Sequence, residues 1–166
     1  EAQYKMLKGV KKVASGYAGG HVKNPTYKQI CQGDTGHAEV IRVDYDPAQI
    51  TFRDVIDLFW DAHDPTTLNR QGNDVGPQYR SIILYTSEEQ KKISEESKVN
   101  AEKIIGKPIV TEIVPLEIFY PAEDYHQDYY KNNPYQGYCQ AVVRPKVSKF
   151  KEKLKEKGKL DEAEVP

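Results

Sequence analysis

The sequence predicts a single α+β domain in which a small mixed β-sheet carries helices packed on it. Segments in which apolar and polar residues alternate, as in strands, interleave with segments whose apolar residues recur at helical spacing. The chain has 166 residues, a length that suits one domain with a core of its own. Its twelve tyrosines, four phenylalanines and one tryptophan supply aromatic surface to bury, although 30% of the residues are charged.

The first half of the chain alternates predicted strands and helices around one long polar loop. In order, the predicted elements are a helical segment over residues 1–7, a strand over 10–17, a loop over 22–36, a strand over 38–45 and a helix from 51 to before 64. Gly9 ends the first helix, and Thr51 caps the second through its hydroxyl group. The loop is rich in Gly, Pro, Asn, Asp and Thr, and loops of this length in compact domains often carry function.

The second half of the chain continues the alternation and ends in a helix. The predicted elements are a loop over residues 66–78, a strand over 79–85, a helix over 87–105, a strand over 109–115, a helix over 122–132 and a last helix over 143–157. Ser87 followed by Gln90 has the pattern of a capping box. The domain is therefore expected to span residues 1–157, and the acidic tail over 158–166 is expected to be disordered.

Charge and hydropathy argue against several classes of partner. The net charge is −1, so nothing in the whole chain indicates binding to nucleic acid or to an anionic membrane. No apolar run approaches the roughly 20 residues that a membrane-spanning helix needs. The lysines of residues 146–157 are interpreted as a solvated helix face with interspersed glutamates. We expect a monomeric, cytoplasmic protein without a metal or another cofactor.

The two cysteines, Cys31 and Cys139, are too few for a disulfide-stapled secreted domain, and they show no paired spacing typical of zinc sites. Cys31 is interpreted as an ordinary thiol. Cys139 ends a Pro- and Gly-containing loop over residues 133–139. A thiol in an exposed loop can meet another thiol, which a buried one cannot.

Glu39 is the carboxylate with the most interesting position, because it follows a glycine-bearing loop at the start of an apolar strand. If its side chain lies among tyrosines, desolvation raises its pKa and lets it act as a general acid. The spacing alone favours a simpler interpretation, a glutamate at a strand edge facing water. His37, Glu39 and His63 also suggest a metal site, but no metal-ligand spacing supports it.

A series of motifs over residues 1–139 resembles the A-type peptide methionine sulfoxide reductases. The motifs are NPTY at 24–27, GDTGHAE at 33–39, HDPTT at 63–67, NRQGND at 69–74, QYRS at 78–81, AEDYHQ at 122–127 and GYC at 137–139. Each motif alone is weak evidence, but their order and spacing together are specific. The resemblance implies a fold related to the ferredoxin-like α/β plait, with long ordered loops and a C-terminal helix.

The resemblance also implies a reaction, the thiol-dependent reduction of methionine S-sulfoxide, free or in proteins, for repair after oxidative damage. Glu39 matches the family's acid, and Tyr27 and Tyr79 match its hydroxyl donors. The residues expected to bind the substrate are Asp74, His126, Tyr129 and Tyr138. Cys139 matches a recycling cysteine, which forms a disulfide with the sulfenic acid left on the nucleophile. In the family, thioredoxin reduces that disulfide.

The nucleophile itself, a cysteine in a Gly-Cys-Phe-Trp motif, is expected just before Glu1, where the sequence begins. Cys31 does not match it. We therefore expect a reductase whose attacking cysteine precedes Glu1. One alternative is a truncated, non-catalytic peptide-binding module. A remote alternative is a small metal hydrolase that uses His37, Glu39 and His63.

Overall fold

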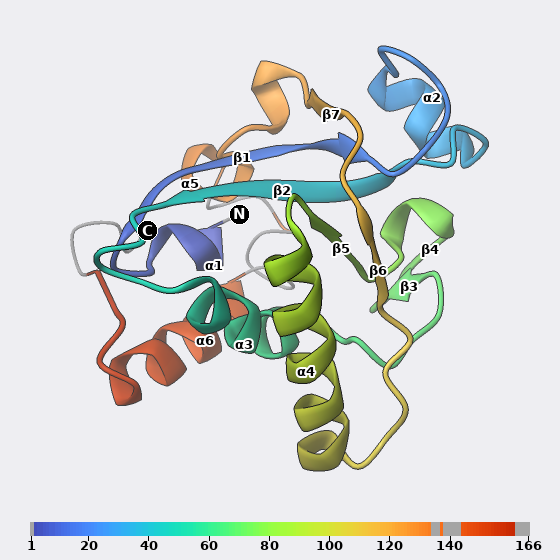
Figure 1. Ribbon diagram of the computed structural model, residues 1–166. Coiled ribbons are helices and arrows are strands. Elements are labelled where there is room, and N and C mark those ends of the chain that lie inside the picture. Colours follow the sequence, from blue (N-terminus) through green and yellow to red (C-terminus); the bar gives the residue numbers. More distant parts are fainter. Residues whose placement is uncertain (1, 134–136, 138–143, 162–166) are drawn as a thin grey trace. The chain divides into compact units, whose positions relative to one another are not determined.

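The computed structural model describes residues 2–133, 137 and 144–161 (Figure 1). The chain forms two compact units. Unit A consists of residues 1–15, 41–51 and 123–166, and unit B of residues 16–40 and 52–122. The predicted α+β class is confirmed, because helices accompany small sheets whose strands pair in both antiparallel and parallel fashion. No helix in the described part of the chain is long and apolar enough to cross a membrane.

A three-stranded sheet has the strand order β2-β1-β7. The strands are β1 (Val10–Ala18), β2 (Ala38–Tyr45) and β7 (Phe119–Pro121). Within unit B, the end of β1 pairs antiparallel with β7, with Tyr17 opposite Tyr120. A Cβ atom at Gly16 would lie 2.4 Å from the Tyr120 carbonyl oxygen, so this register requires a glycine. Strands β1 and β2 confirm the two predicted strands, whereas β7 was not predicted.

The core of unit B forms where two helices meet a parallel pair of strands. These elements are α3 (Phe52–Ala62), β5 (Ile82–Tyr85), α4 (Glu88–Ile105) and β6 (Glu112–Pro115). Parallel strands need a crossover connection, and α4 supplies it between β5 and β6 (Figure 1). The buried apolar side chains of this core are Ile56, Trp60, Ile83, Ala101 and Ile109. The Trp60 indole Nε1–H donates to Ser97 Oγ at 2.8 Å, so the ring is fixed as well as buried.

Both predicted loops contain short elements, so their assignment as loops is corrected. The segment 22–36 contains helix α2 (Tyr27–Gln32), which Thr26 and Gln29 begin with a complete capping box. The segment 66–78 contains the hairpin strands β3 (Arg70–Gln71) and β4 (Asp74–Val75) and the start of a 3₁₀ turn, η1 (Pro77–Tyr79). Because Tyr79 belongs to this turn, β5 begins at Ile82 and not at Tyr79 as predicted.

In unit A, the short helix α1 (Ala2–Lys5) packs against α6 (Arg144–Glu156). The rings of Tyr4 and Phe150 have centroids 6.0 Å apart, and Phe150 is 1% exposed. The predicted last helix is therefore confirmed, and it packs within unit A. Leu160 forms an isolated bridge with Leu7, so the first residues of the predicted disordered tail are paired.

The predicted helix over residues 122–132 is wrong. Two short turns stand in its place, η2 (Asp124–His126) and α5 (Tyr129–Asn132). Asp128 lies between them with a left-handed φ of 53°, which a continuous right-handed helix does not allow. The Gln127 side-chain amide accepts from the Ser15 N–H and donates to the Ser15 carbonyl, both at 2.8 Å, and so holds this segment to β1.

Candidate active site

Unit B brings together four of the predicted site residues. Tyr27 is the first residue of α2, Glu39 lies on β2, Asp74 on β4 and Tyr79 at the end of η1. Their ionisation is linked, because the Asp74 charge acts on Glu39, and both Glu39 and Tyr79 act on Tyr27. The four side chains therefore form one neighbourhood although they come from four separate elements.

Glu39 has the properties of a group that holds a proton near neutral pH. Its pKa is raised to about 7, first because surrounding protein atoms desolvate the carboxylate and second because the negative charge of Asp74 opposes ionisation. The residue nevertheless keeps an exposed surface, so its carboxyl group can reach a ligand from solution. A carboxylic acid that is half protonated at neutral pH is suited to general acid catalysis.

Tyr27 is held as a neutral phenol. Its pKa is raised to about 12, chiefly by a side-chain hydrogen bond with Cys31 and then by desolvation and by nearby negative charge, including that of Glu39. Tyr27 is 38% exposed, and Cys31 is exposed one helical turn later. Side chains four residues apart meet on a helix, so their spacing would have predicted this contact. The sequence analysis missed it because it assigned this segment to a loop.

The loop before Glu39 is fixed by His37, which is 3% exposed. The Gly20 N–H donates to His37 Nδ1 at 3.0 Å, so Nε2 carries the proton and donates to the Val22 carbonyl at 2.6 Å. A Cβ atom at Gly20 would lie 2.3 Å from the His37 backbone nitrogen, so the close approach of these segments depends on glycine. His37 therefore has a structural role, with both ring nitrogens engaged by the protein.

His63 is engaged in the same way, with hydrogen bonds at both ring nitrogens. Its Nδ1 donates to the Phe59 carbonyl at 2.8 Å, and its Nε2 accepts from Ser81 Oγ at 2.6 Å. Ser81 Oγ also lies 2.7 Å from Thr111 Oγ1. Among the described residues, no group of three or more His, Cys, Asp or Glu side chains is arranged to hold a metal ion. The geometry thus gives no support to the predicted alternative of a metal hydrolase.

The hairpin that carries Asp74 is anchored through the residue opposite it. Gln71 pairs with Asp74 across the hairpin, and its side-chain amide accepts from the Asp64 N–H at 3.1 Å and donates to the Asp64 carbonyl at 2.7 Å. Hydrogen bonds from the Thr66 hydroxyl and N–H lower the pKa of Asp64. The Asp64 backbone therefore supports the hairpin, and with it the position of Asp74.

The remaining predicted site residues fall outside unit B. His126 and Tyr129 are half-buried in unit A, on η2 and α5. Tyr138 and the predicted recycling residue Cys139 lie outside the described residues. The substrate-binding role of the first pair and the role of Cys139 remain predictions.

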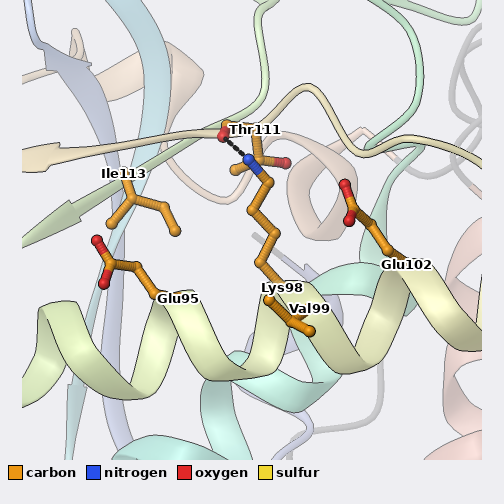
Figure 2. Close-up of a pocket in the computed structure, with 6 residues that line it drawn as sticks. All are labelled: Glu95, Lys98, Val99, Glu102, Thr111 and Ile113. Carbon is orange, nitrogen blue, oxygen red and sulfur yellow. Dashed lines mark hydrogen bonds between the residues drawn. The ribbon is translucent and has the colours of Figure 1, made fainter.

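A separate hollow of about 350 Å³ lies between α4 and β6 (Figure 2). Its lining residues are Glu95, Lys98, Val99, Glu102, Thr111 and Ile113, and none is a predicted site residue. The Lys98 ammonium donates to the Thr111 carbonyl at 3.2 Å, as Figure 2 shows, and Glu102 accepts from the Ile109 N–H at 2.9 Å. Two of its charged groups thus serve internal contacts, and the hollow is not part of the candidate site.

Comparison with known proteins decides the family. A sequence profile described as peptide methionine sulfoxide reductase matches residues 1–159. The chain belongs to the peptide methionine sulfoxide reductase family. The family and the class of reaction predicted from the motifs, reduction of a methionine sulfoxide, are thereby confirmed.

Individual members of the peptide methionine sulfoxide reductase family agree with this assignment. The chain is 55% identical to the peptide methionine sulfoxide reductase MsrA of Saccharolobus solfataricus, over 98% of this chain and 92% of that protein. The crystal structure of Saccharomyces cerevisiae Mxr1 in reduced form is 39% identical with a TM-score of 0.75, covering 79% of this chain and 76% of Mxr1. The crystal structure of Mxr1 in complex with Trx2 is 29% identical with a TM-score of 0.51, and the match covers 70% of this chain and 65% of that chain.

Proposed function

We propose that this protein reduces methionine S-sulfoxide, free or in proteins, to methionine, with Glu39 as the acid that protonates the departing oxygen. The observation that carries the proposal is the environment of Glu39, whose pKa of about 7 places its proton exchange in the physiological range. Membership of the family supplies the reaction class, and the four clustered side chains of unit B supply groups suited to it.

The first chemical step is attack of a cysteine thiolate on the sulfoxide sulfur. This is the nucleophilic cysteine that the resemblance to the family predicts. As the new sulfur–sulfur interaction forms, negative charge develops on the sulfoxide oxygen, which takes up the proton of Glu39. The oxygen is then transferred to the cysteine, so methionine leaves as the reduced thioether and the cysteine is oxidised to a sulfenic acid.

The tyrosine hydroxyls stabilise the charge that develops on the oxygen. Tyr27 remains neutral throughout the physiological range because its pKa is raised to about 12, so it keeps its proton and can donate to the sulfoxide oxygen in place of Cys31. Tyr79, at the end of η1, supplies the second hydroxyl. Donors held in place before the reaction stabilise charge in the transition state more than that in the ground state. The negative charge of Asp74 adds to desolvation in raising the pKa of Glu39. We also assign Asp74 the ordering of polar groups of the substrate.

The oxidised cysteine is returned to the thiol in two further steps. The Cys139 thiol attacks the sulfenic sulfur, a disulfide forms and water leaves. A dithiol then reduces this disulfide and is itself oxidised. We assign this role to thioredoxin, with the complex of Mxr1 with Trx2 in support. We further propose that the protein acts as a monomer in the cytoplasm and that the reaction requires no metal or other cofactor.

The cysteine cycle is tested by the stoichiometry of product in purified protein. Without added reductant, Cys139→Ser is expected to form about one methionine per molecule and to leave a sulfenic acid that a dimedone probe labels. Thioredoxin-driven turnover is expected to be lost in that variant and kept in Cys31→Ser, the matched thiol control. Undiminished thioredoxin-driven turnover in Cys139→Ser would refute the recycling role.

A further inference from the structure

The guanidinium group of Arg80 joins three separate segments of unit B. Its Nη2 donates to the Gly36 carbonyl at 2.9 Å, and its Nη1 donates to the Pro77 carbonyl at 2.9 Å. Its Nε lies 3.3 Å from a carboxylate oxygen of Glu112 on β6. The Arg80 side chain is only 13% exposed, whereas its ion-pair partner Glu112 is 51% exposed, so the bond to the Gly36 carbonyl is the most buried of the three contacts.

Two of the three segments lead directly to proposed catalytic side chains. Gly36 precedes Glu39 by three residues in a loop that His37 and Thr35 already make rigid, with the His37 N–H donating to Thr35 Oγ1 at 3.2 Å. Pro77 begins the η1 turn that ends at Tyr79. The guanidinium therefore bridges the loop that leads to Glu39, the proposed acid, and the turn that ends at Tyr79, a proposed hydroxyl donor.

The geometry requires an arginine at this position. A guanidinium presents five donors in a planar fork and can serve two carbonyls and a carboxylate at once, whereas a lysine ammonium is a single point. The end of β1 also leaves room for the fork. A Cβ atom at Gly19 would lie 3.3 Å from Arg80 Nη2, and the φ of Gly19 is +85°, which disfavours other residues.

We infer that Arg80 is a positioning residue, which sets the separation of Glu39 and Tyr79 without contacting the substrate. This inference rests on the proposed function, since it concerns the same two side chains. It assigns the guanidinium a geometric role and not an electrostatic one, because the groups that shift the pKa of Glu39 are the surrounding protein atoms and Asp74. A misplacement of about 1 Å in such a site costs up to about 100-fold in rate.

The kinetic test compares Arg80→Met, Arg80→Lys and the control Glu112→Gln in thioredoxin-driven reduction of a sulfoxide peptide. In Arg80→Met we expect kcat to fall about 10- to 100-fold, while KM stays within about 3-fold because Arg80 does not touch the substrate. Arg80→Lys keeps the charge but not the fork, so we expect it not to restore kcat. Glu112→Gln removes only the half-exposed ion pair and is expected to stay within about 2-fold.

A second readout is independent of turnover. Carboxyl carbon NMR of the labelled protein gives the pKa of Glu39 in each variant. A loosened site admits water, so we expect the pKa in Arg80→Met and Arg80→Lys to fall from about 7 toward the ordinary glutamate value of about 4.3. If Arg80 acted through its charge, its removal would raise the pKa instead. Arg80→Lys serves both readouts if Arg80→Met does not fold.

Three results would overturn the inference. They are an unchanged Glu39 pKa with unchanged kcat, a raised pKa in Arg80→Met, or full recovery of kcat in Arg80→Lys. Failure of the proposed function is recognised separately. If Glu39→Gln retained wild-type turnover, the acid role would fall, while the NMR titration of the Arg80 variants would still show whether Arg80 sets the surroundings of Glu39.

Discussion

Raising the pH through the pKa of Glu39 is expected to slow the chemical step, because only the protonated carboxyl group can donate. With a pKa of about 7, the protonated fraction is about one half at pH 7, about one eleventh at pH 8 and about one hundredth at pH 9. The single-turnover rate at saturating sulfoxide is therefore expected to fall about tenfold per pH unit on the alkaline side.

The substitution Asp74→Asn tests whether the negative charge of Asp74 contributes to the raised pKa of Glu39. Removing the negative charge of Asp74 favours ionisation of Glu39, so the pKa of Glu39 falls and the alkaline limb moves to lower pH. Asp74 is exposed, and exposed charge pairs contribute about 0.2–1 kcal/mol, which corresponds to a loss of up to about fivefold in rate at pH 8. Near pH 6, where Glu39 is mostly protonated in both proteins, the difference should shrink to less than about 1.5-fold.

Rapid-quench measurement of methionine formation between pH 6 and 9 checks both statements. Glu95→Gln, which removes a carboxylate from the separate hollow on α4, is the matched control and should follow the wild-type curve. A flat profile above pH 7 would contradict proton donation by Glu39. An alkaline limb that Asp74→Asn leaves in place, or moves to higher pH, would contradict the electrostatic link between the two carboxylates.

Three further predictions concern stability and the hydroxyl donors. The pKa of Glu39 is higher in the folded state than in the unfolded chain, so this residue makes the protein less stable as the pH rises from about 4.3 to about 7. Glu39→Gln should therefore be more stable than wild type at pH 8 but not at pH 4, as measured by urea unfolding. Phe150→Ala should lower the free energy of unfolding by about 3–5 kcal/mol, since the ring is 1% exposed. A decrease below about 1 kcal/mol by the same method would argue against the packing of this ring in unit A. Tyr27→Phe should lower kcat about 100-fold while leaving the melting temperature almost unchanged, because the phenol is 38% exposed, and an unchanged kcat would exclude it as a donor.

Local sequence patterns predicted the regular elements whose signals are contained within a few residues. The N-cap of α4 is an example, since Ser87 Oγ accepts from the Gln90 N–H at 3.2 Å. The Gln90 side chain accepts from the Thr86 N–H and not from that of Ser87, so the reciprocal half of the predicted box is displaced by one residue. Thr26 and Gln29 show the same pattern and begin α2, but the surrounding Pro and Gly residues led to a loop assignment.

Elements that depend on distant partners were not predictable in this way. Strand β7 has three residues, and its pairing with β1 joins segments about one hundred positions apart. The break at Asp128 is similar, because the Gln127 amide bonds to Ser15 and the Lys5 ammonium pairs with Asp128. Such contacts override the local helix preference of residues 122–132 and leave no trace in the periodicity of that segment.

In the candidate site, too, some features could be predicted from the sequence, whereas those that depend on distant partners could not. Motif matches singled out Tyr27, Glu39, Asp74 and Tyr79, which lie close together in unit B, and their roles stay predictions. Spacing alone predicted a solvated strand edge for Glu39, and the residue is exposed on β2. A local pattern could not show the desolvation by residues from other elements that raises its pKa. The bridge made by Arg80 was equally hidden, since its partner carbonyl of Gly36 lies 44 positions away.

We propose that Glu39 supplies the proton for sulfoxide reduction, and the single-turnover rate of Glu39→Gln at pH 7 tests this role most directly. The substitution keeps the size of the side chain and removes only its ability to give up a proton. With Glu95→Gln as the control, we expect Glu39→Gln to slow methionine formation by about 100-fold or more while the control matches wild type. A rate for Glu39→Gln within about 3-fold of wild type would contradict proton donation by Glu39.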